Sequence, residues 1–375
     1  MKYNNSMKVA YLFGSLNRGG TETLYLDFFR KVKNPLFDVV GLYRKNGSLS
    51  DDFLSSGIRM IHLPVKKHGV VGYLRLLRKS IDSEHIDVVH AQQTGDCMVA
   101  LAANRRRTAK IVLTVHCFDS GSGVLKRYMM RLAFRKADAV CFVSETQKQF
   151  YVEKYNLKNS SKLHVVYNGV DFSKLDNANS EEVNLPLKSG TKKECLKLAM
   201  VGNFGPVRDH FTICRFLKAI RDKGVAYHFY FIGKKNDSSP ELFENCKRYC
   251  QENGLSNYVD FLGSRGDVPE LLKQMDAFVY STERDTFGIA VVEAIASGLP
   301  VFVNDWGVMK EITNNGAWAT LYETKNVEDL CAKFMDFVKH QLEYKEKAKN
   351  NAIAVRNEYS IERFADKLWK VYRTL

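Results

Sequence analysis

Short β-branched and aromatic runs alternate along the chain with longer segments whose apolar residues recur every three to four positions. This alternation predicts parallel strands joined by helical crossovers. In the first half, strands are expected over residues 8–14, 38–44, 59–64, 87–92, 110–116, 139–144 and 163–169. A second series is expected over residues 196–203, 227–233, 259–263, 277–281, 300–304 and 319–323. The pattern favours two α/β domains in tandem.

A polar stretch separates the two series. Residues 171–194 contain Pro and Gly without an apolar period, so we interpret them as a linker. A chain of 375 residues also exceeds what one hydrophobic core normally organises. We therefore predict an N-terminal domain over residues 1–180 and a C-terminal domain over residues 181–355, doubly wound and facing a central cleft. Ligands of such sheets bind beyond the carboxyl ends of the strands, so the loops there are the places to look for chemistry.

The last segment, residues 356–375, reads as a separate amphipathic helix. Ile361, Phe364, Leu368 and Tyr372 recur at helical spacing and form one apolar stripe. This helix is expected to pack its stripe on another part of the protein.

The basic excess lies almost entirely in one half. Of the net charge of +14, residues 1–180 contribute 28 Lys+Arg against 15 Asp+Glu, and residues 181–375 contribute 28 against 27. This asymmetry predicts an anionic partner for the first half: nucleic acid, a phospholipid surface or a phosphorylated substrate. A solvated basic surface is the alternative. Residues 125–138 mix basic with Tyr, Met, Leu and Phe side chains, which suits anionic lipid headgroups.

Export and metal signals are weak. No run of 18 apolar residues could span a bilayer, and the start lacks the order of a secretory signal, so a cytoplasmic protein is expected. The eight cysteines are scattered apart from Cys246 and Cys250. That pair has no second ligand pair nearby, so it is expected on a helix face rather than around zinc.

The loop after the first strand carries adjacent glycines. Gly19 and Gly20 allow a tight turn and a close ligand approach, and Thr21 is expected to cap a helix whose N-terminus attracts anions. A structural strand-to-helix turn would look the same. The spacing is not G-x-G-x-x-G, which argues against an oxidoreductase.

Three further side chains lie at or just after the ends of strands. His116 ends the fifth strand and can hydrogen-bond a hydroxyl or share a proton, whereas His90, at the end of the fourth strand, is a weaker candidate. Arg208 lies on a Gly-Pro loop, and its planar guanidinium suits phosphate oxygens. A buried structural histidine and a surface arginine are the alternatives.

The stretch "STERDTFGIAVVEAIASGLPV" predicts a strand, a charged loop and a helix that ends at Gly298. Thr286 is expected to be the N-cap, which leaves the amides of Phe287, Gly288 and Ile289 for an anion. These amides predict an anion-binding site at the start of the helix.

Glu293 is the only charge on this helix, and its apolar neighbours predict a partly buried carboxylate that needs a partner such as a bound diol. A helical rise of about 1.5 Å per residue would place Asp285 and Glu293 roughly 12 Å apart. That separation is too long for a shared metal or a glycosidase acid pair. It suits two ends of an extended ligand with an anionic middle, such as a nucleotide sugar.

Taken in order, these motifs resemble the retaining glycosyltransferases of family 4, which have the GT-B fold of two Rossmann-like domains. The resemblance rests on "GSLNRGGTE", "TVH", "VSE", "VYNGVD", "VGNFGPVRDH", "FLGSRGDVPELL" and "STERDTFGIAVVEAIASGLPV", and it covers nearly the whole chain from Met7. It implies a nucleotide-sugar cosubstrate without a metal or other cofactor. It also implies that the terminal helix crosses back to the N-terminal domain.

The resemblance implies a role for each candidate in the reaction. The paired acidic residues fall on Asp285, for the donor sugar, and Glu293, for the ribose. The basic residue on the diphosphate falls on Arg208, and the histidine near the reacting sugar falls on His116.

Other positions are implied to bind the donor. The glycine loop near the phosphate and acceptor falls on Gly19 and Gly20, and the nucleobase region falls on Ser264 and Arg265. The amides of Phe287, Gly288 and Ile289, after the Thr286 cap, complete the phosphate site.

Two positions depart from the family pattern. The family usually has Glu where this chain has Asp285, and Glu283 is a possible substitute two residues earlier. Asn203 stands where many members carry an Arg on the phosphate, which would leave Arg208 with most of the charge.

The expected function is transfer of a sugar, from a UDP-sugar by family frequency, to a lipid-linked glycan of a capsule, exopolysaccharide, lipopolysaccharide or O-antigen. The basic N-terminal domain would rest on the inner face of the cytoplasmic membrane. A GT-B epimerase or phosphorylase is the competing enzyme, although no cofactor lysine of a phosphorylase is evident. A basic nucleic-acid-binding protein is the competing class, and it would have no use for Glu293.

Overall fold

The computed structural model describes residues 6–119, 123–158, 160–179, 183, 185 and 195–375. It divides into two compact units, one up to Asp171 with Ile361–Leu375 and one over Phe172–Ser360. The changes of unit come after Asp171 and after Ser360, whereas the boundaries predicted from the sequence were after residues 180 and 355.

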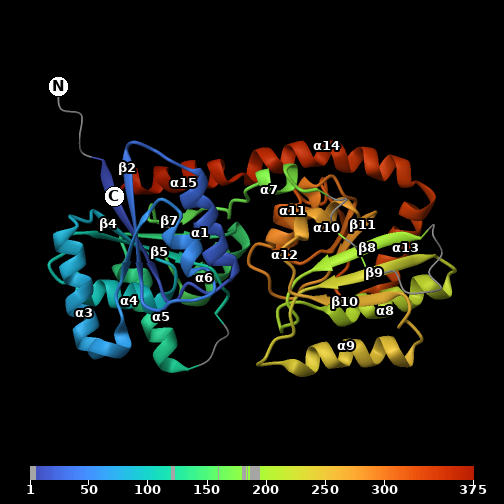
Figure 1. Ribbon diagram of the computed structural model, residues 1–375, viewed down its shortest axis with the longest axis horizontal. Helices are drawn as coiled ribbons and strands as arrows, with labels where there is room; N and C mark the ends of the chain where they lie inside the picture. The colour runs from blue at the N-terminus through green and yellow to red at the C-terminus, as the bar shows by residue number, and fades with distance from the viewer. Residues whose placement is uncertain (1–5, 120–122, 159, 180–182, 184, 186–194) are drawn as a thin grey trace. The chain divides into compact units, whose positions relative to one another are not determined.

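The first unit is built on a parallel sheet with strand order β3-β2-β1-β4-β5-β6-β7 (Figure 1). Its strands are β1 (Met7–Phe13), β2 (Phe37–Tyr43), β3 (Arg59–His62), β4 (Val88–Ala91), β5 (Lys110–Val115), β6 (Ala139–Phe142) and β7 (Leu163–Val165). Its helices are α1 (Gly20–Lys31), α2 (Ser50–Leu54), α3 (Val65–Ser83), α4 (Thr94–Ala103), α5 (Val124–Lys136), α6 (Glu145–Tyr155) and α15 (Ile361–Arg373). The strand order reverses between β1 and β4.

The second unit has a parallel sheet with order β10-β9-β8-β11-β12-β13, which reverses between β8 and β11. Its strands are β8 (Leu196–Val201), β9 (Tyr227–Ile232), β10 (Val259–Gly263), β11 (Ala277–Tyr280), β12 (Val301–Asn304) and β13 (Thr320–Tyr322). Its helices are α7 (Ser173–Asp176), α8 (His210–Asp222), α9 (Pro240–Glu252), α10 (Val268–Lys273), α11 (Ile289–Ala296), α12 (Gly307–Ile312), α13 (Val327–Lys339) and α14 (Gln341–Tyr359). Every strand predicted from the sequence is present.

Helices cover both faces of the first sheet, as parallel strands buried on both sides require. Residues such as Leu77, Cys97 and Phe134 fill the layer between the sheet and α3, α4 and α5. The opposite layer holds α1 and α15, which lie side by side, with Phe28 and Leu368 among its residues (Figure 1). The core of the first unit is therefore completed by the last helix of the chain.

The predicted stripe on the last helix is confirmed, since Ile361, Phe364, Leu368 and Tyr372 are all buried. The Tyr372 hydroxyl bonds to a ring nitrogen of His90 at 2.6 Å and donates to the Tyr11 hydroxyl at 2.8 Å. The helix is thus fixed by polar contacts as well as by apolar packing.

The predicted linker is only partly irregular. Its first residues form α7, where Asp176 accepts a hydrogen bond from Arg356 of α14 at 2.6 Å and the Arg356 guanidinium lies over the Phe172 ring. These contacts place α7 within the second unit. Residues 180–182, 184 and 186–194 of the predicted linker lie outside the described residues.

Candidate functional site

The loops after β8 and β11 meet at the switch point of the second sheet. The Glu283 amide donates to the Val207 carbonyl at 3.0 Å, and the Asp209 amide donates to the Ser281 carbonyl at 3.1 Å. The Thr282 hydroxyl adds a bond to the Val207 carbonyl at 2.8 Å. These bonds hold Arg208 in a rigid backbone at the carboxyl edge of the sheet.

The Arg208 side chain is fixed by two partners from the β11 side. Its Nε donates to the Tyr280 hydroxyl at 2.9 Å, and its Nη2 lies 3.7 Å from Asp285 Oδ1. A Cβ on Gly202 would lie 2.4 Å from the Arg208 side chain, so only glycine leaves room for it. The guanidinium therefore lies against the end of β8, and its position is set by the fold.

Tyr280 bridges Arg208 and Asp285. Its fully buried hydroxyl donates a short hydrogen bond to Asp285 Oδ2 while accepting one from Arg208. Burial raises the pKa of Tyr280, so the phenol stays neutral. Tyr280, and then Asp285, raise the pKa of Arg208 against the opposing effect of burial. The cluster thus presents a permanent positive charge held by a buried carboxylate.

Glu283 lies in a different environment from Asp285. It pairs with Lys325 at 2.8 Å, and both side chains are exposed. Asp285 is only 8% exposed, and its carbonyl accepts a bond from the Trp306 indole at 3.3 Å. Of the two candidate carboxylates, Asp285 is the one that lies beside Arg208.

The helix after this loop begins later than the sequence predicted. Its N-cap is Gly288 rather than Thr286, and Ile289 is the first helical residue. Gly288 has φ +87°, where side chains are strained, and a Cβ there would lie 2.8 Å from Met309 Cε. Of the three amides predicted at the helix start, only that of Ile289 belongs to the helix, while Phe287 is buried in the preceding turn.

Glu293 lies in the second turn of α11 and is half-buried. Glu293 has an interaction within the chain. Its contact with a ligand diol stays a prediction. The helical rise used to predict a 12 Å separation from Asp285 applies only from Ile289 onward, because the segment before it is not helical. The left-handed Gly298 that follows the helix is confirmed, with φ +77°.

The remaining donor-site candidates follow β8 and β10. Asn203 is exposed, and its Oδ1 accepts from the Lys234 amide at 3.0 Å, which leaves its amide nitrogen as a donor. Ser264 is exposed. Arg265 is held by Asp267 through two bonds of 2.7 and 2.5 Å. β10 is the edge strand, so Ser264 and Arg265 lie away from the switch point.

His116 lies at the carboxyl edge of the first sheet, just after β5. Its Nε2 is 3.0 Å from Oε1 of the buried Gln92, which follows β4. Burial lowers the pKa of His116 to about 4, so the ring is neutral near pH 7 and suited to hydrogen bonding. His90 is fully buried, with both ring nitrogens bonded to Tyr372 and Thr114. His90 is therefore a buried structural histidine, which was the alternative to a functional role.

The glycine loop after β1 differs from the prediction in its cap. Gly19, not Thr21, is the N-cap of α1, and the helix begins at Gly20. A Cβ on Gly19 would lie 2.6 Å from Glu22 Oε2, whereas among the described residues no atom lies within 4 Å of one on Gly20. Burial raises the pKa of Glu22. A side chain at Gly19 would therefore displace the Glu22 carboxylate, and Gly20 faces open space.

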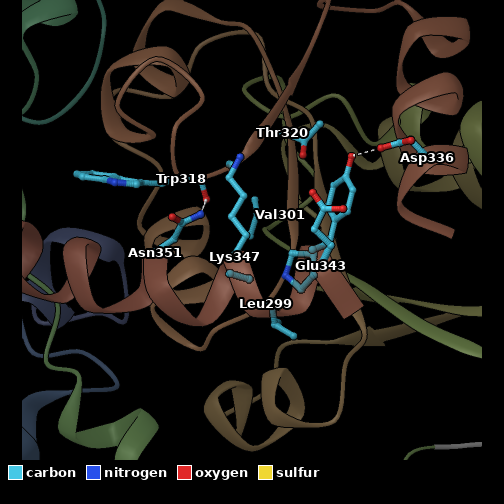
Figure 2. Close-up of a pocket in the computed structure, with 12 residues that line it drawn as sticks. Leu299, Val301, Trp318, Thr320, Asp336, Glu343, Lys347 and Asn351 are labelled. Atoms are coloured by element: carbon cyan, nitrogen blue, oxygen red, sulfur yellow. Dashed lines mark hydrogen bonds between the residues drawn. The ribbon is translucent and has the colours of Figure 1, made fainter. Parts of the chain in front are cut away.

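A pocket of about 180 Å³ lies on the opposite side of the second sheet (Figure 2). Val301 and Thr320, at the first positions of β12 and β13, line it, together with Glu343 and Lys347 of α14. It therefore lies at the amino ends of the strands, away from Arg208. It is not part of the site predicted from the sequence.

The described residues offer neither a metal-binding cluster nor a membrane-spanning helix. Among the described residues, no cluster of three or more His, Cys, Asp or Glu side chains could hold a metal ion. Cys246 and Cys250 are buried thiols on α9, as predicted. Within the same part of the chain, every helix is too short or too polar to cross a bilayer.

The sequence missed Tyr280 and Gln92, which position Arg208 and His116. The available signal for Tyr280 was a phenol ending an otherwise apolar strand, "AFVYS". A hydroxyl there has to find a partner when the strand is buried. Without the fold, Tyr280 could not be paired with Arg208, nor Gln92 with His116.

Two doubly wound parallel sheets are the architecture of the GT-B fold that was expected from the sequence. Residues 18–174 match Glycosyltransferase Family 4, and residues 184–355 match Glycosyl transferases group 1. The chain therefore belongs to family 4 of the glycosyltransferases. The resemblance inferred from the motifs is confirmed.

Similar proteins come from several bacteria. EpsF of Bacillus subtilis (strain 168), named as a glycosyltransferase, is 26% identical over 319 residues, 80% of each chain. The UDP-Gal:alpha-D-GlcNAc-diphosphoundecaprenol alpha-1,3-galactosyltransferase of Escherichia coli is 24% identical over 318 residues, again 80% of each. The structure of Anabaena HepE in complex with UDP and glucose has a TM-score of 0.81 at 16% identity, covering 98% of this chain and 100% of that one.

Proposed function

We propose that this enzyme transfers a sugar from a UDP-sugar to a lipid-linked glycan in the synthesis of a capsule, exopolysaccharide, lipopolysaccharide or O-antigen. The name of the E. coli relative specifies UDP-Gal and a diphosphoundecaprenol acceptor. Anabaena HepE, similar in fold, binds UDP and glucose. Both support a UDP-sugar donor for this chain.

The observation that carries the proposal is the Arg208–Tyr280–Asp285 cluster at the switch point of the second sheet. In this proposal the Arg208 guanidinium binds the diphosphate, and the α11 N-terminus at Ile289 adds amide donors. Asp285 contacts the donor sugar, and Glu293 contacts the ribose. Asn203, Ser264 and Arg265 extend the donor site toward the nucleobase.

The reaction would retain the anomeric configuration without a metal. When the bond between sugar and diphosphate breaks, negative charge develops on the leaving diphosphate. Arg208 and the amides at the start of α11 would stabilise that charge, and neutral His116 would hydrogen-bond the reacting sugar. The acceptor proton would leave to an oxygen of the departing diphosphate. Undiminished turnover in EDTA and a product with the donor's anomeric configuration are the expected results; loss of turnover in EDTA, restored by Mg²⁺, would contradict metal independence.

The decisive experiment compares nucleotide binding and transfer in matched variants. UDP should raise the midpoint of thermal unfolding, and GDP or an oligonucleotide should raise it less. Arg208→Ala and Glu293→Ala should each lower transfer by at least about tenfold, since each removes a hydrogen bond to a charged group. Arg248→Ala removes an exposed arginine from α9 and serves as the control. Near-full transfer by Arg208→Ala would remove the site proposed here.

We also propose that the enzyme works on the inner face of the cytoplasmic membrane through α5. Val124, Leu125 and Tyr128, at its start, are 85%, 72% and 61% exposed, although large apolar side chains usually avoid water. Arg127 and Arg131 are exposed on the same helix. An exposed apolar end beside basic side chains suits the interface of an anionic bilayer.

Vesicle flotation tests this surface. The protein should float with vesicles containing phosphatidylglycerol and less with neutral phosphatidylcholine vesicles. Leu125→Ser should weaken flotation, whereas Ile353→Ser, which removes an exposed apolar side chain from α14, should not. Equal flotation of all three proteins would place the membrane contact elsewhere, and no flotation of the wild type would refute it.

A further inference from the structure

Arg44 reaches across the switch point of the first sheet. It follows β2, and its Nη2 donates to Asp96 Oδ1 at 2.5 Å, on the first turn of α4 after β4. Between these two elements lies the end of β1, where a Cβ on Gly14 would be only 2.9 Å from the same Nη2. The guanidinium thus lies over the strand end at which the order of the sheet reverses, where doubly wound sheets bind ligands.

The Arg44 side chain has unused hydrogen-bonding capacity. A guanidinium carries five N–H donors, and among the described residues Asp96 is the only acceptor bonded to that of Arg44. The side chain remains 27% exposed, whereas that of Asp96 is 1% exposed. Asp96 therefore positions the group, and Arg44 is the residue that a ligand can reach.

The surroundings of Arg44 are polar and incompletely satisfied. Asp96 Oδ2 is buried without a hydrogen-bond partner among the described residues, and so is the hydroxyl of Tyr73 on α3. Burial raises the pKa of Asp96 to about 6, and Arg44 opposes that shift. Buried polar groups normally have partners, so such a cluster is unusual for a purely structural ion pair.

The loop that carries Arg44 is braced against the glycine loop after β1. The Arg44 amide donates to the Phe13 carbonyl at 3.2 Å, and the Leu16 amide donates to the Lys45 carbonyl at 3.1 Å. The Leu49 amide donates in turn to the Leu16 carbonyl at 2.8 Å. A ligand bound by the turn before α1 would therefore contact a loop that is hydrogen-bonded to the loop that carries Arg44.

We propose that Arg44, positioned by Asp96, binds a phosphate oxygen of the lipid-linked acceptor. The inference rests on the proposed function for the identity of the acceptor. The planar fork of Arg suits phosphate by paired bonds. The basic excess of residues 1–180 favours an anionic rather than a neutral ligand.

The test measures binding of farnesyl diphosphate, a water-soluble prenyl diphosphate, by calorimetry in the presence of saturating UDP. Arg44→Ala should raise its dissociation constant by about 10- to 100-fold, because a hydrogen bond to a charged group is lost. Arg44→Lys should recover part of the affinity, since it keeps the charge and loses the fork. Asp96→Asn should give a smaller rise than Arg44→Ala.

Arg59→Ala is the matched control, because Arg59 is an exposed arginine at the amino end of β3 in the same sheet. It should bind farnesyl diphosphate as the wild type does. Unchanged affinity in Arg44→Ala, or no binding by the wild type, would overturn the proposal. Failure of UDP to bind would count against the proposed function instead, while the comparison of diphosphate affinities would still decide the role of Arg44.

Discussion

Replacing Tyr280 by Phe tests whether the bridge between Arg208 and Asp285 is what orders the candidate site. The substitution removes one buried oxygen and leaves the ring in place. Arg208 Nε loses the acceptor that it contacts at 2.9 Å, and Asp285 Oδ2 loses its donor. Both groups that lose a hydrogen bond are charged, which makes the loss more costly than that of a neutral bond.

The size of the effect follows from these partners. A hydrogen bond to a charged group contributes about 1.5–3 kcal/mol. Two such bonds are lost, but Arg208 Nη2 and Asp285 Oδ1 are already 3.7 Å apart and can close to a direct ion pair. We therefore expect a net loss of about 1.5–3 kcal/mol in the free energy of unfolding, or roughly 3–12 °C in Tm. The guanidinium would also be less ordered, so UDP should bind several-fold more weakly.

Thermal unfolding with and without UDP, together with a UDP titration, measures both effects. Tyr227→Phe is the matched control, since its buried hydroxyl donates to the neutral Leu217 carbonyl at 2.8 Å rather than to a charged group. It should cost about 0.5–1.5 kcal/mol and leave UDP affinity unchanged. If Tyr280→Phe destabilised the protein no more than this control and bound UDP equally well, the bridge would not be what orders Arg208.

Two further predictions follow from packing and from proton binding. Gly202→Ala should weaken UDP binding by about tenfold in a titration, because its Cβ would lie 2.4 Å from the Arg208 side chain and displace a charged hydrogen-bonding group; unchanged affinity would show that Arg208 can move without loss. Acid should destabilise the fold: burial lowers the pKa of His90 to about 3 and that of His116 to about 4, so their stabilisation is complete above the unfolded value of about 6.5 and is lost as the pH falls toward the folded values. His210, whose pKa burial also lowers to about 3, is a third such group, and Asp96, with its pKa raised to about 6, offsets one of the three between pH 6 and 4. These four groups leave a net loss of about 2.7 kcal/mol per pH unit in urea unfolding; a constant free energy of unfolding over that range would contradict the assignment.

The sequence alone was sufficient to predict the strands and their positions along the chain. Apolar runs of five to seven residues, bounded by turns, identify buried parallel strands well. Helix starts were harder, because Thr21 and Thr286 have favourable capping side chains whereas the structure uses Gly19 and Gly288. At Gly288 the φ is +87°, and side chains of α12 leave no room for a Cβ, which no local pattern reports.

Side-chain partners were the least predictable part of the site. Arg208 was found from its loop, but Tyr280 lies 72 residues further along the chain. Arg44 and Asp96 are 52 residues apart, and nothing near either of them in the sequence indicates the other. The Arg44–Asp96 pair can be recognised only from the fold, because the strand order brings the ends of β1, β2 and β4 together at one edge of the first sheet.

Because Ile361–Leu375 belong to the first unit, the chain passes from one unit to the other twice. During synthesis the second unit, continuous over Phe172–Ser360, has all its residues before the first unit has its last helix. While the second unit is being synthesised, one face of the first sheet is therefore still exposed to water. This is the face that later packs against Phe364, Leu368 and Tyr372. Until α15 arrives, that apolar face is a place where a chaperone can bind or aggregation can begin.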